Sequence, residues 1–427
     1  MFFTNAQDVI KHLYSLPKLH EKADLNYIKR VLKLLGDPQD QVKTIHVTGT
    51  NGKGSTSYYL SNLLQKAGQK TGLFVSPYIF EFNERIQLNG QNISNSELVR
   101  IANLVEKALD QIRIEDPSFA LVTFEYEVII AFVYFEQVKC DYAVIEVGIG
   151  GEHDKTNVIT PEVSIITTIG LDHEDVIGPT LLDIAREKSG VIKTKRPVVL
   201  GNLPKEVMPI IEERAREESA PIRKLGKDFF VSGDQKIRYR DNKKKLSFNV
   251  RPEVEGFDIA VAIQAFSLLH LPLAPDEIEE AINQTIIPGR YQVLQSEPLI
   301  ILDGAHNIQA MQNLLNFIHE QARLRHSTVR ILMMMMRDKD LDEVFSLFQP
   351  TDQIELTTID YPRAAKKEDF PNWVVQKYPY HENWQSAYKH LKLESQADDI
   401  LLVTGSFYLV GEVLHLEENA KNENYWY

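Results

Sequence analysis

The sequence is poor in cysteine: Cys140 is the only one among 427 residues. One thiol cannot build a disulfide framework, so the composition favours a reducing compartment, and Cys140 is interpreted as a small buried apolar residue. Long apolar runs are also missing, because the longest, residues 126–135, is about half of a membrane span and contains Glu127. No basic segment followed by an apolar one stands near the N-terminus, as a secretory signal would require. These absences predict a cytoplasmic protein that does not enter a membrane.

Basic residues are outnumbered by acidic ones, 47 against 60, which gives a formal net charge of −13. This balance argues against nucleic acid and membrane surfaces as partners, because both attract clustered Lys and Arg. A negative net charge does not exclude small anionic ligands, because a few hydrogen-bond donors and cations placed together can still bind them. The hydrophobic share of 43% is enough for a sizeable core, and the length predicts two or three domains. We expect a monomer that acts on small molecules.

Short β-branched runs alternate with amphipathic segments, which is typical of an α/β protein with a mainly parallel sheet. The first series of predicted strands covers residues 43–47, 72–75, 142–147, 163–168 and 197–200. The predicted helices between and after them cover residues 55–67, 95–112, 124–138, 181–189 and 206–218. Residues 227–250 alternate polar and apolar side chains, which indicates a small antiparallel excursion. A second α/β series begins near Pro298, so the predicted domains are 1–294 and 295–427.

A glycine-rich run, Thr48-Gly-Thr-Asn-Gly-Lys-Gly-Ser-Thr56, lies between the first predicted strand and the helix after it. Glycines let backbone N–H groups converge on phosphate oxygens, and the helix N-terminus with Lys53 adds positive charge. The spacing differs from G-x-x-x-x-G-K-[ST], because two residues separate Gly49 from Gly52 and Gly54 follows Lys53. A structural turn without a ligand is the alternative, but three glycines around a lysine at this junction favour a nucleotide phosphate site.

Polar side chains follow several predicted strands, where open α/β sheets place their ligands. Glu146 ends an apolar strand, and a buried carboxylate there needs a partner or a metal such as Mg²⁺. His173 stands in an acidic run that could instead cap a helix, and Lys188 taken alone could be a solvated helix lysine. Late in the chain, Asp303 and His306 stand at another strand end, close after Arg290, a natural partner for phosphate.

An ordered set of motifs resembles the folylpolyglutamate synthase and dihydrofolate synthase family, within the Mur-type ATP-dependent amide ligases. The matching runs are VTGTNGKGST (47–56), FVSPYIFEFNERI (74–86), TFE (123–125), IEVGIGG with DKTNV (145–158), LDH with a following Gly (171–178), EKSGVIK (187–193), PGR (288–290), LDGAHN (302–307), RDKD (337–340) and VTGSFYLVGEV (403–413). Together they span residues 43–413 approximately. The resemblance implies a P-loop ATPase-like domain with a mainly parallel sheet, followed by a smaller Rossmann-like α/β domain with the nucleotide in the cleft between them.

The resemblance also implies the chemistry. Such enzymes phosphorylate a folate carboxylate with ATP, and the amine of L-glutamate then displaces phosphate from the acyl phosphate. By position, the residues assigned to ATP are Asn51, Gly52, Lys53, Gly54, Ser55, Arg290 and Asp303. Those assigned to Mg²⁺ are Ser76, Glu146, His173 and Lys188.

The remaining roles are carried over in the same way. Lys188 matches a lysine that the family carbamylates with CO₂, and the residues assigned to catalysis are Lys188, Asp303 and His306. Those assigned to the folate are Arg85, Phe124 and Glu125. One departure is Asp258, which stands where the family usually has an Asn that contacts the nucleotide.

Three alternatives remain beside a ligase that adds L-glutamate to tetrahydrofolate. The first is a bifunctional enzyme that also joins glutamate to dihydropteroate, which residues 123–125 permit. The second is a Mur ligase of cell-wall synthesis, which the glycine at position 54 and the run around Arg85 disfavour. The third is a nucleotide-gated binding module without catalysis, against which Glu146, His173 and Lys188 argue.

Overall fold

The structure is a computed structural model that describes residues 2–17, 20, 24–172, 174–233, 236–249 and 251–423. The chain divides into two compact units, Met1–Thr285 and Ile286–Tyr427, which are described separately. The predicted boundary at 294/295 lies within the second unit, inside a strand that pairs with the second sheet. Within the described residues, no helix is both long and apolar enough to cross a membrane.

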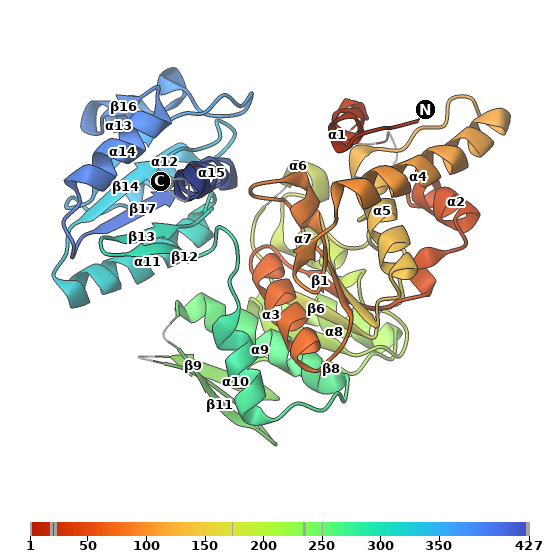
Figure 1. The fold of residues 1–427 in the computed structure, drawn as a ribbon. Coiled ribbons are helices and arrows are strands. Elements are labelled where there is room, and N and C mark those ends of the chain that lie inside the picture. The colour runs from red at the N-terminus through yellow and green to blue at the C-terminus, as the bar shows by residue number, and fades with distance from the viewer. Residues whose placement is uncertain are drawn as a thin grey trace. The chain divides into compact units, whose positions relative to one another are not determined.

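The first unit is built on a sheet that has eight strands within its described residues, in the order β4-β3-β2-β5-β1-β6-β7-β8. Among them, β1, β6 and β8 are labelled in Figure 1. These strands are β1 Lys43–Thr48, β2 Thr71–Phe74, β3 Ile86–Leu88, β4 Gln91–Asn92, β5 Tyr142–Glu146, β6 Val163–Thr168, β7 Val198–Asn202 and β8 Ile222–Lys224. All neighbours from β2 to β8 are parallel, and β3 and β4 form an antiparallel edge. The predicted mainly parallel sheet is therefore confirmed.

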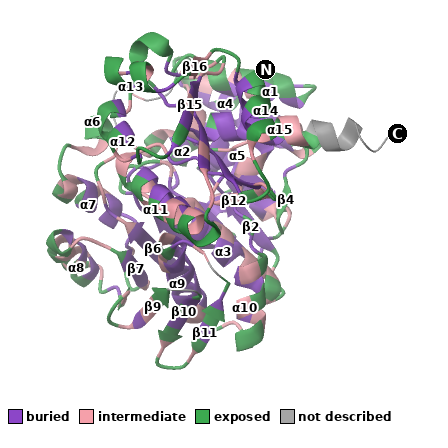
Figure 2. Cartoon of the chain, turned by 90° about the vertical axis from the view of Figure 1, so that its left-hand side faces the viewer, coloured by how far each residue is buried: buried purple, intermediate pink, exposed green. Residues whose placement is uncertain are grey.

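Helices cover this sheet and give it two apolar layers. They are α1 Ala6–Ser15, α2 Asn26–Leu34, α3 Lys53–Lys66, α4 Asn95–Glu115, α5 Thr123–Gln137, α6 Glu174–Ile177, α7 Leu181–Ser189, α8 Met208–Glu217, α9 Glu253–Leu268 and α10 Pro275–Gln284, with short 3₁₀ turns at Pro38–Asp40, Phe82–Arg85 and Lys205–Val207. Helix α5 is apolar around most of its circumference because α1, α2 and α4 pack against it. The central strands are buried, whereas α8 and α10 expose polar faces (Figure 2).

The predicted antiparallel excursion is confirmed as a three-stranded sheet, counted over the described residues, in the order β11-β10-β9. Its strands are β9 Phe229–Gly233, β10 Ile237–Asp241 and β11 Lys245–Phe248. Alternate side chains such as Ile237 and Tyr239 are buried, which is the period-two pattern of a sheet with one face on the core. That face packs against α9, since a Cβ on Gly256 would lie 3.1 Å from Ile237 Cδ1.

The second unit has one sheet in the order β12-β13-β17-β14-β15-β16, six strands among the residues that the structure describes. Its strands are β12 Gln292–Ser296, β13 Leu299–Leu302, β14 Val329–Met333, β15 Gln353–Thr357, β16 Tyr380–His381 and β17 Ile400–Thr404. Its helices are α11 Ile308–Arg325, α12 Leu341–Ser346, α13 Asn372–Lys377, α14 Trp384–Glu394 and α15 Phe407–Glu423, with a 3₁₀ turn at Lys367–Asp369. All pairs are parallel except β12–β13. The expected second α/β domain is confirmed.

Candidate active site

The glycine-rich run forms the turn between β1 and α3. Gly52 has a φ of +81°, a left-handed conformation that favours glycine, and α3 begins at the next residue, Lys53. A Cβ on Gly52 would also lie 2.2 Å from Oδ1 of Asp258, so a side chain has no room there. The turn therefore requires glycine for both its backbone conformation and its close contact with α9, and it exposes helix N-terminal N–H groups to an anion.

Hydrogen bonds hold this turn to the carboxyl end of β6. The Thr50 N–H donates to the Thr168 carbonyl at 3.0 Å, and the Asn51 N–H donates to Thr168 Oγ1 at 2.9 Å. The Lys53 ammonium donates to the carbonyls of Gly49 at 3.0 Å and Thr50 at 3.4 Å. Lys53 thus places its charge over the loop itself, where phosphate oxygens would approach.

Glu146 lies beside the start of α3. It is the last residue of β5, is 3% exposed, and its Oε2 accepts a hydrogen bond of 3.0 Å from the Ser76 N–H. Both of its carboxylate oxygens lie 3.7 Å from the position of a Cβ on Gly54. The structure therefore brings Ser76 and Glu146 to the phosphate loop, as parallel strands that end at one edge of a sheet would require.

Lys188 is buried in the last turn of α7, with 4% of its surface exposed. Desolvation, reinforced by the positive charge of Lys53, lowers the pKa of Lys188 to about 7, although Asp172 and Asp154 oppose the shift. A Cβ on Gly151 would lie 3.0 Å from the Lys188 Cα, so the loop after β5 passes directly against this helix. A buried lysine with a lowered pKa is a functional-site feature that spacing alone did not reveal.

His173 lies outside the described residues, so the structure does not place it. Within the described residues, no group of three or more His, Cys, Asp or Glu side chains forms a self-contained metal site. The donors at this edge fit Mg²⁺ bound to a nucleotide, because that ion takes one or two carboxylates and fills its other positions with phosphate oxygens and water. Glu146 satisfies this requirement at the phosphate loop.

Arg85 is packed between aromatic rings at the end of a 3₁₀ turn. Its guanidinium lies 5.1 Å from the Tyr78 ring centroid and 5.8 Å from that of Phe82, and its Nε is 3.6 Å from Glu127 Oε1. Burial raises the pKa of Glu127, and the charge of Arg85 opposes that shift. Arg85 is therefore held within a buried ion pair and an aromatic pocket of the first unit.

Phe124 and Glu125 are adjacent in sequence but face different surroundings. The Phe124 ring lies 5.9 Å from that of Phe74, and its Cζ would be 2.7 Å from a Cβ on Gly148. The Glu125 carboxylate is fully buried. It accepts a hydrogen bond from the Val122 N–H and pairs with His20 at 2.8 Å and with Lys155 at 3.1 Å. Sequence reasoning missed these two partners, although Lys155 stands inside the DKTNV run.

The remaining predicted residues gather at the carboxyl end of β13 in the second unit. Asp303 is 4% exposed and accepts hydrogen bonds from the N–H groups of Tyr291 and Ala305. Burial raises the pKa of Asp303, against the opposing charge of Arg290. Arg290 and His306 both contact the Phe407 ring, at centroid distances of 4.7 and 5.9 Å. The structure thus brings Arg290, Asp303 and His306 together within this unit.

Comparison with known proteins agrees with this architecture. Residues 120–265 match the model of the Mur ligase middle domain, and residues 289–407 match that of the Mur ligase, glutamate ligase domain. The folylpolyglutamate synthase of Lacticaseibacillus casei is 31% identical, over 96% of this chain and 98% of that protein. The dihydrofolate synthase/folylpolyglutamate synthase of Bacillus subtilis is 29% identical, over 96% and 99%. The chain belongs to the folylpolyglutamate synthase and dihydrofolate synthase family.

A solved structure supports the same assignment of fold. The bifunctional folylpolyglutamate synthase/dihydrofolate synthase of Yersinia pestis, crystallised with AMPPNP and a manganese ion, has a TM-score of 0.86 at 26% identity. The match covers 97% of this chain and 98% of that one. The resemblance to folate ligases that the sequence motifs indicated is therefore confirmed over nearly the whole chain.

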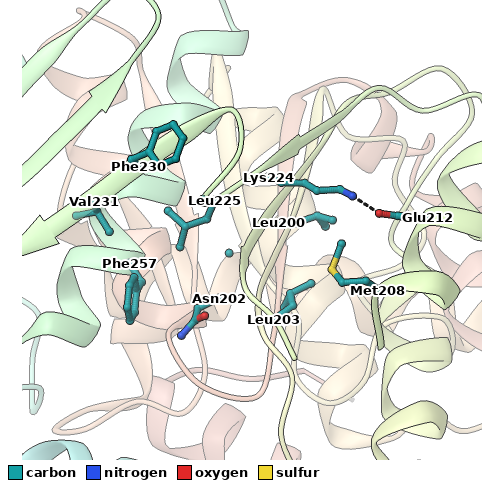
Figure 3. A pocket seen from close by; sticks show the side chains of 12 residues that line it. Leu200, Asn202, Leu203, Met208, Glu212, Lys224, Leu225, Phe230, Val231 and Phe257 are labelled. Carbon is teal, nitrogen blue, oxygen red and sulfur yellow. Dashed lines mark hydrogen bonds and ion pairs between the residues drawn. The ribbon is translucent and has the colours of Figure 1, made fainter. Parts of the chain in front are cut away.

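This folate-ligase family member also has a cavity of about 490 Å³ beyond the carboxyl ends of β7 and β8. Figure 3 shows apolar side chains, among them Phe230 and Phe257, on one side of it and the Lys224–Glu212 ion pair on the other. None of the predicted site residues that the structure describes lines this cavity. Its lining nevertheless adjoins the phosphate loop, because Phe257 directly precedes Asp258, whose carboxylate contacts Gly52.

Proposed function

We propose that this protein is an ATP-dependent ligase that joins L-glutamate to tetrahydrofolate, or to its polyglutamates, and releases ADP and phosphate. The observation that carries the proposal is the Glu146 carboxylate beside Gly54 at the phosphate loop, in a chain that belongs to the folate-ligase family. Glycine-rich backbone, lysine and carboxylate together suit phosphoryl transfer, which depends mainly on positioning and charge neutralisation.

Phosphate binding in this proposal falls to Asn51, Gly52, Lys53, Gly54 and Ser55. The N–H groups at the start of α3 hold the phosphate oxygens, and the Lys53 ammonium exchanges its loop carbonyls for the β- and γ-phosphates. The γ-phosphoryl group passes to the folate carboxylate, which becomes an acyl phosphate. The glutamate amine then attacks the acyl carbon, and phosphate leaves as the amide forms.

The divalent ion of the reaction would be held by Ser76, Glu146 and His173, with Lys188 completing the set once carbamylated. Such an ion supplies charge neutralisation for the phosphates when it is bound. Lys188 suits carbamylation because its lowered pKa leaves a large share of the amine neutral near pH 7, and the neutral amine is the form that adds to CO₂. The addition gives a carbamate anion and releases one proton.

Carbamylation of Lys188 can be tested apart from turnover. The protein is equilibrated with ¹³C-labelled bicarbonate, and the carbamate carbon is sought by NMR in the wild type and in Lys188→Ala. A carbamate signal that disappears in the variant supports the proposal. An identical spectrum for both proteins contradicts it.

The folate end is assigned to Arg85, Phe124 and Glu125. Phe124 supplies a flat apolar surface for an aromatic ring, and Arg85 a cation next to two aromatic side chains. Because the Glu125 carboxylate is engaged with His20 and Lys155, its part in the proposal is to hold the start of α5 in place. From the second unit, Arg290 and Asp303 are assigned to the nucleotide and His306 to the reacting groups.

The deciding experiment is a substrate panel with ATP, L-glutamate and Mg²⁺. We expect ADP release that requires both glutamate and a reduced folate, and a product heavier by one glutamyl unit. Glu146→Gln removes the negative charge at constant size, so we expect turnover to fall by about 100-fold or more. Absence of folate-dependent ADP release in the wild type would refute the proposed function.

Dihydropteroate is the second acceptor to test, because the B. subtilis and Y. pestis relatives carry both activities in their names. Turnover with dihydropteroate would assign the bifunctional activity to this chain. Turnover with reduced folates alone would assign the single activity.

A further inference from the structure

A histidine that the proposed ligase mechanism does not use lies in the centre of the first sheet. His46 is in β1, between β5 and β6, and its side chain is fully buried. Its Nε2 lies 2.8 Å from Thr156 Oγ1, whereas its Nδ1 has no hydrogen-bond partner among the residues that the structure describes. Burial, together with the charge of Lys193, lowers the pKa of His46 to about 3, so the ring is neutral near pH 7.

The direction of each hydrogen bond in this group follows from its chemistry. Thr156 Oγ1 also contacts Asp154 Oδ1, and a carboxylate only accepts hydrogen bonds, so the single hydroxyl proton of Thr156 points to Asp154. Thr156 Oγ1 must then accept a hydrogen bond from His46, which places the ring proton on Nε2. The orphan Nδ1 is consequently a bare acceptor, which costs less to bury than an unpaired N–H donor.

Asp154 extends this series of hydrogen bonds to the loop that follows β5. Its Oδ1 accepts a further hydrogen bond from the Thr156 N–H at 2.9 Å, and its Oδ2 accepts one from the Ile149 N–H at 3.0 Å. A Cβ on Gly148 would lie 3.1 Å from Asp154 Oδ2 and 2.7 Å from Phe124 Cζ. The Asp154 carboxylate therefore fixes the loop where it passes the Phe124 ring.

The same loop contacts two more parts of the proposed site. The Thr48 hydroxyl, at the start of the phosphate loop, donates to the Gly150 carbonyl at 2.6 Å. Gly151 packs against the backbone at Lys188, so a side chain there would collide with α7. Residues 147–157 thus lie between the phosphate loop, Lys188 and Phe124.

We propose that His46 is a positioning residue of the ligase: through Thr156 and Asp154 it sets the conformation of loop 147–157, and with it the folate surface at Phe124. The inference rests on the proposed function. A residue that only filled the core would be expected to be apolar, because an imidazole with an orphan nitrogen is more costly to bury than an apolar side chain.

The test separates positioning from stability with paired variants. Thr156→Val removes the hydroxyl at nearly constant shape, and Thr156→Ser restores it. His46→Leu removes the donor, and His46→Gln returns an amide N–H close to the place of Nε2. Ser164→Ala is the matched control, because Ser164 is the β6 residue in register with His46, is almost as buried, and loses a hydroxyl that donates to Val191 O rather than to loop 147–157.

We expect Thr156→Val and His46→Leu to lower kcat/KM for the folate by about tenfold or more, as misplaced binding groups do, with KM for ATP changed less than about twofold. The restoring variants should return to within about threefold of the wild type. Hydrogen–deuterium exchange of residues 147–157 should accelerate in the two disrupting variants and not in Ser164→Ala.

Unchanged folate kinetics and unchanged exchange in Thr156→Val would overturn the proposal, and so would equal losses in Ser164→Ala. If His46→Leu does not fold, His46→Met, which also lacks the N–H donor, takes its place beside the Thr156 pair. The exchange measurement needs no turnover. An inactive wild type would therefore refute the proposed function, while the effect of the hydrogen bonds from His46 to Asp154 on loop 147–157 could still be measured.

Discussion

The carboxylate of Asp258, in α9, lies directly against Gly52 of the phosphate loop, at 2.2 Å from the place that a Cβ would occupy. Two elements that are more than 200 residues apart therefore share one tight contact. The same residue is the departure from the family pattern that the sequence showed at this position. Asp258 consequently leaves no room for a side chain at position 52 of the loop. It also places a carboxylate next to the proposed nucleotide site.

Gly52→Ala tests this contact. The new methyl group must displace Asp258 or the loop, and the φ of +81° disfavours any side chain, so we expect ATP to bind at least about tenfold more weakly, or about 1.4 kcal/mol. Isothermal titration with a non-hydrolysable ATP analogue measures this effect. Gly36→Ala is the control, because Gly36 has a similar φ of +85° and open space around it, so its variant should bind ATP normally.

The elements that carry this site were predictable because each strand has its own local pattern. β6 and α7 match the predicted ranges, since a buried β-branched run and a capped amphipathic segment need no distant information. Strand β12 was not predicted, because it is an antiparallel edge strand of mixed polarity with no fully buried residue. The boundary at 294/295 was placed inside it for the same reason.

Within the site, the sequence could predict only that residues at the carboxyl ends of neighbouring parallel strands lie close together. Glu146 could be placed near the phosphate loop because parallel strands end at one edge of a sheet. The pairing of Glu125 with Lys155, and the chain from His46 to Asp154, join residues that are 30 and 108 positions apart in sequence, and no local periodicity encodes such pairs. The low pKa of Lys188 likewise depends on burial that only the packed structure provides.

Lys188→Ala should abolish ligation while it spares nucleotide binding. The variant loses the group proposed to become a carbamate, so we expect kcat to fall by about 100-fold or more, with the Kd for ATP changed less than about threefold. Lys193→Ala is the matched control: it lies in the same EKSGVIK run, and its ammonium donates to the Gly190 carbonyl. Full activity in Lys188→Ala, or an equal loss in Lys193→Ala, would contradict the assigned role.

Arg251 stabilises the place where the chain leaves the first unit. Its guanidinium contacts the Tyr59 hydroxyl of α3 at 3.0 Å, the buried Glu255 carboxylate at 3.2 Å, and the carbonyl of Thr285, the last residue of the unit, at 3.4 Å. Arg251→Met keeps the apolar stem but leaves Glu255 without this cation, which typically costs about 3–5 kcal/mol.

A clear fall in the thermal midpoint of the first unit is therefore expected for Arg251→Met. Arg223→Met is the comparison, because Arg223 is 48% exposed and lies 3.8 Å from Asp228, a surface pair worth at most about 1 kcal/mol. Equal midpoints for the two variants would show that the buried cation does not stabilise the fold.

His46 should make the folded protein sensitive to acid. Its pKa falls from 6.5 to about 3 on folding, so between these values the unfolded chain takes up a proton that the folded protein refuses. The contribution of His46 to the free energy of unfolding is therefore constant well above pH 6.5 and decreases as the pH falls through this window, by about 2 kcal/mol at pH 5. His46→Gln has no group that titrates there and keeps an N–H donor for Thr156. Denaturant unfolding of both proteins at pH 7.5 and pH 5 measures the difference, and parallel losses of stability would show that His46 does not titrate as its burial and the charge of Lys193 require.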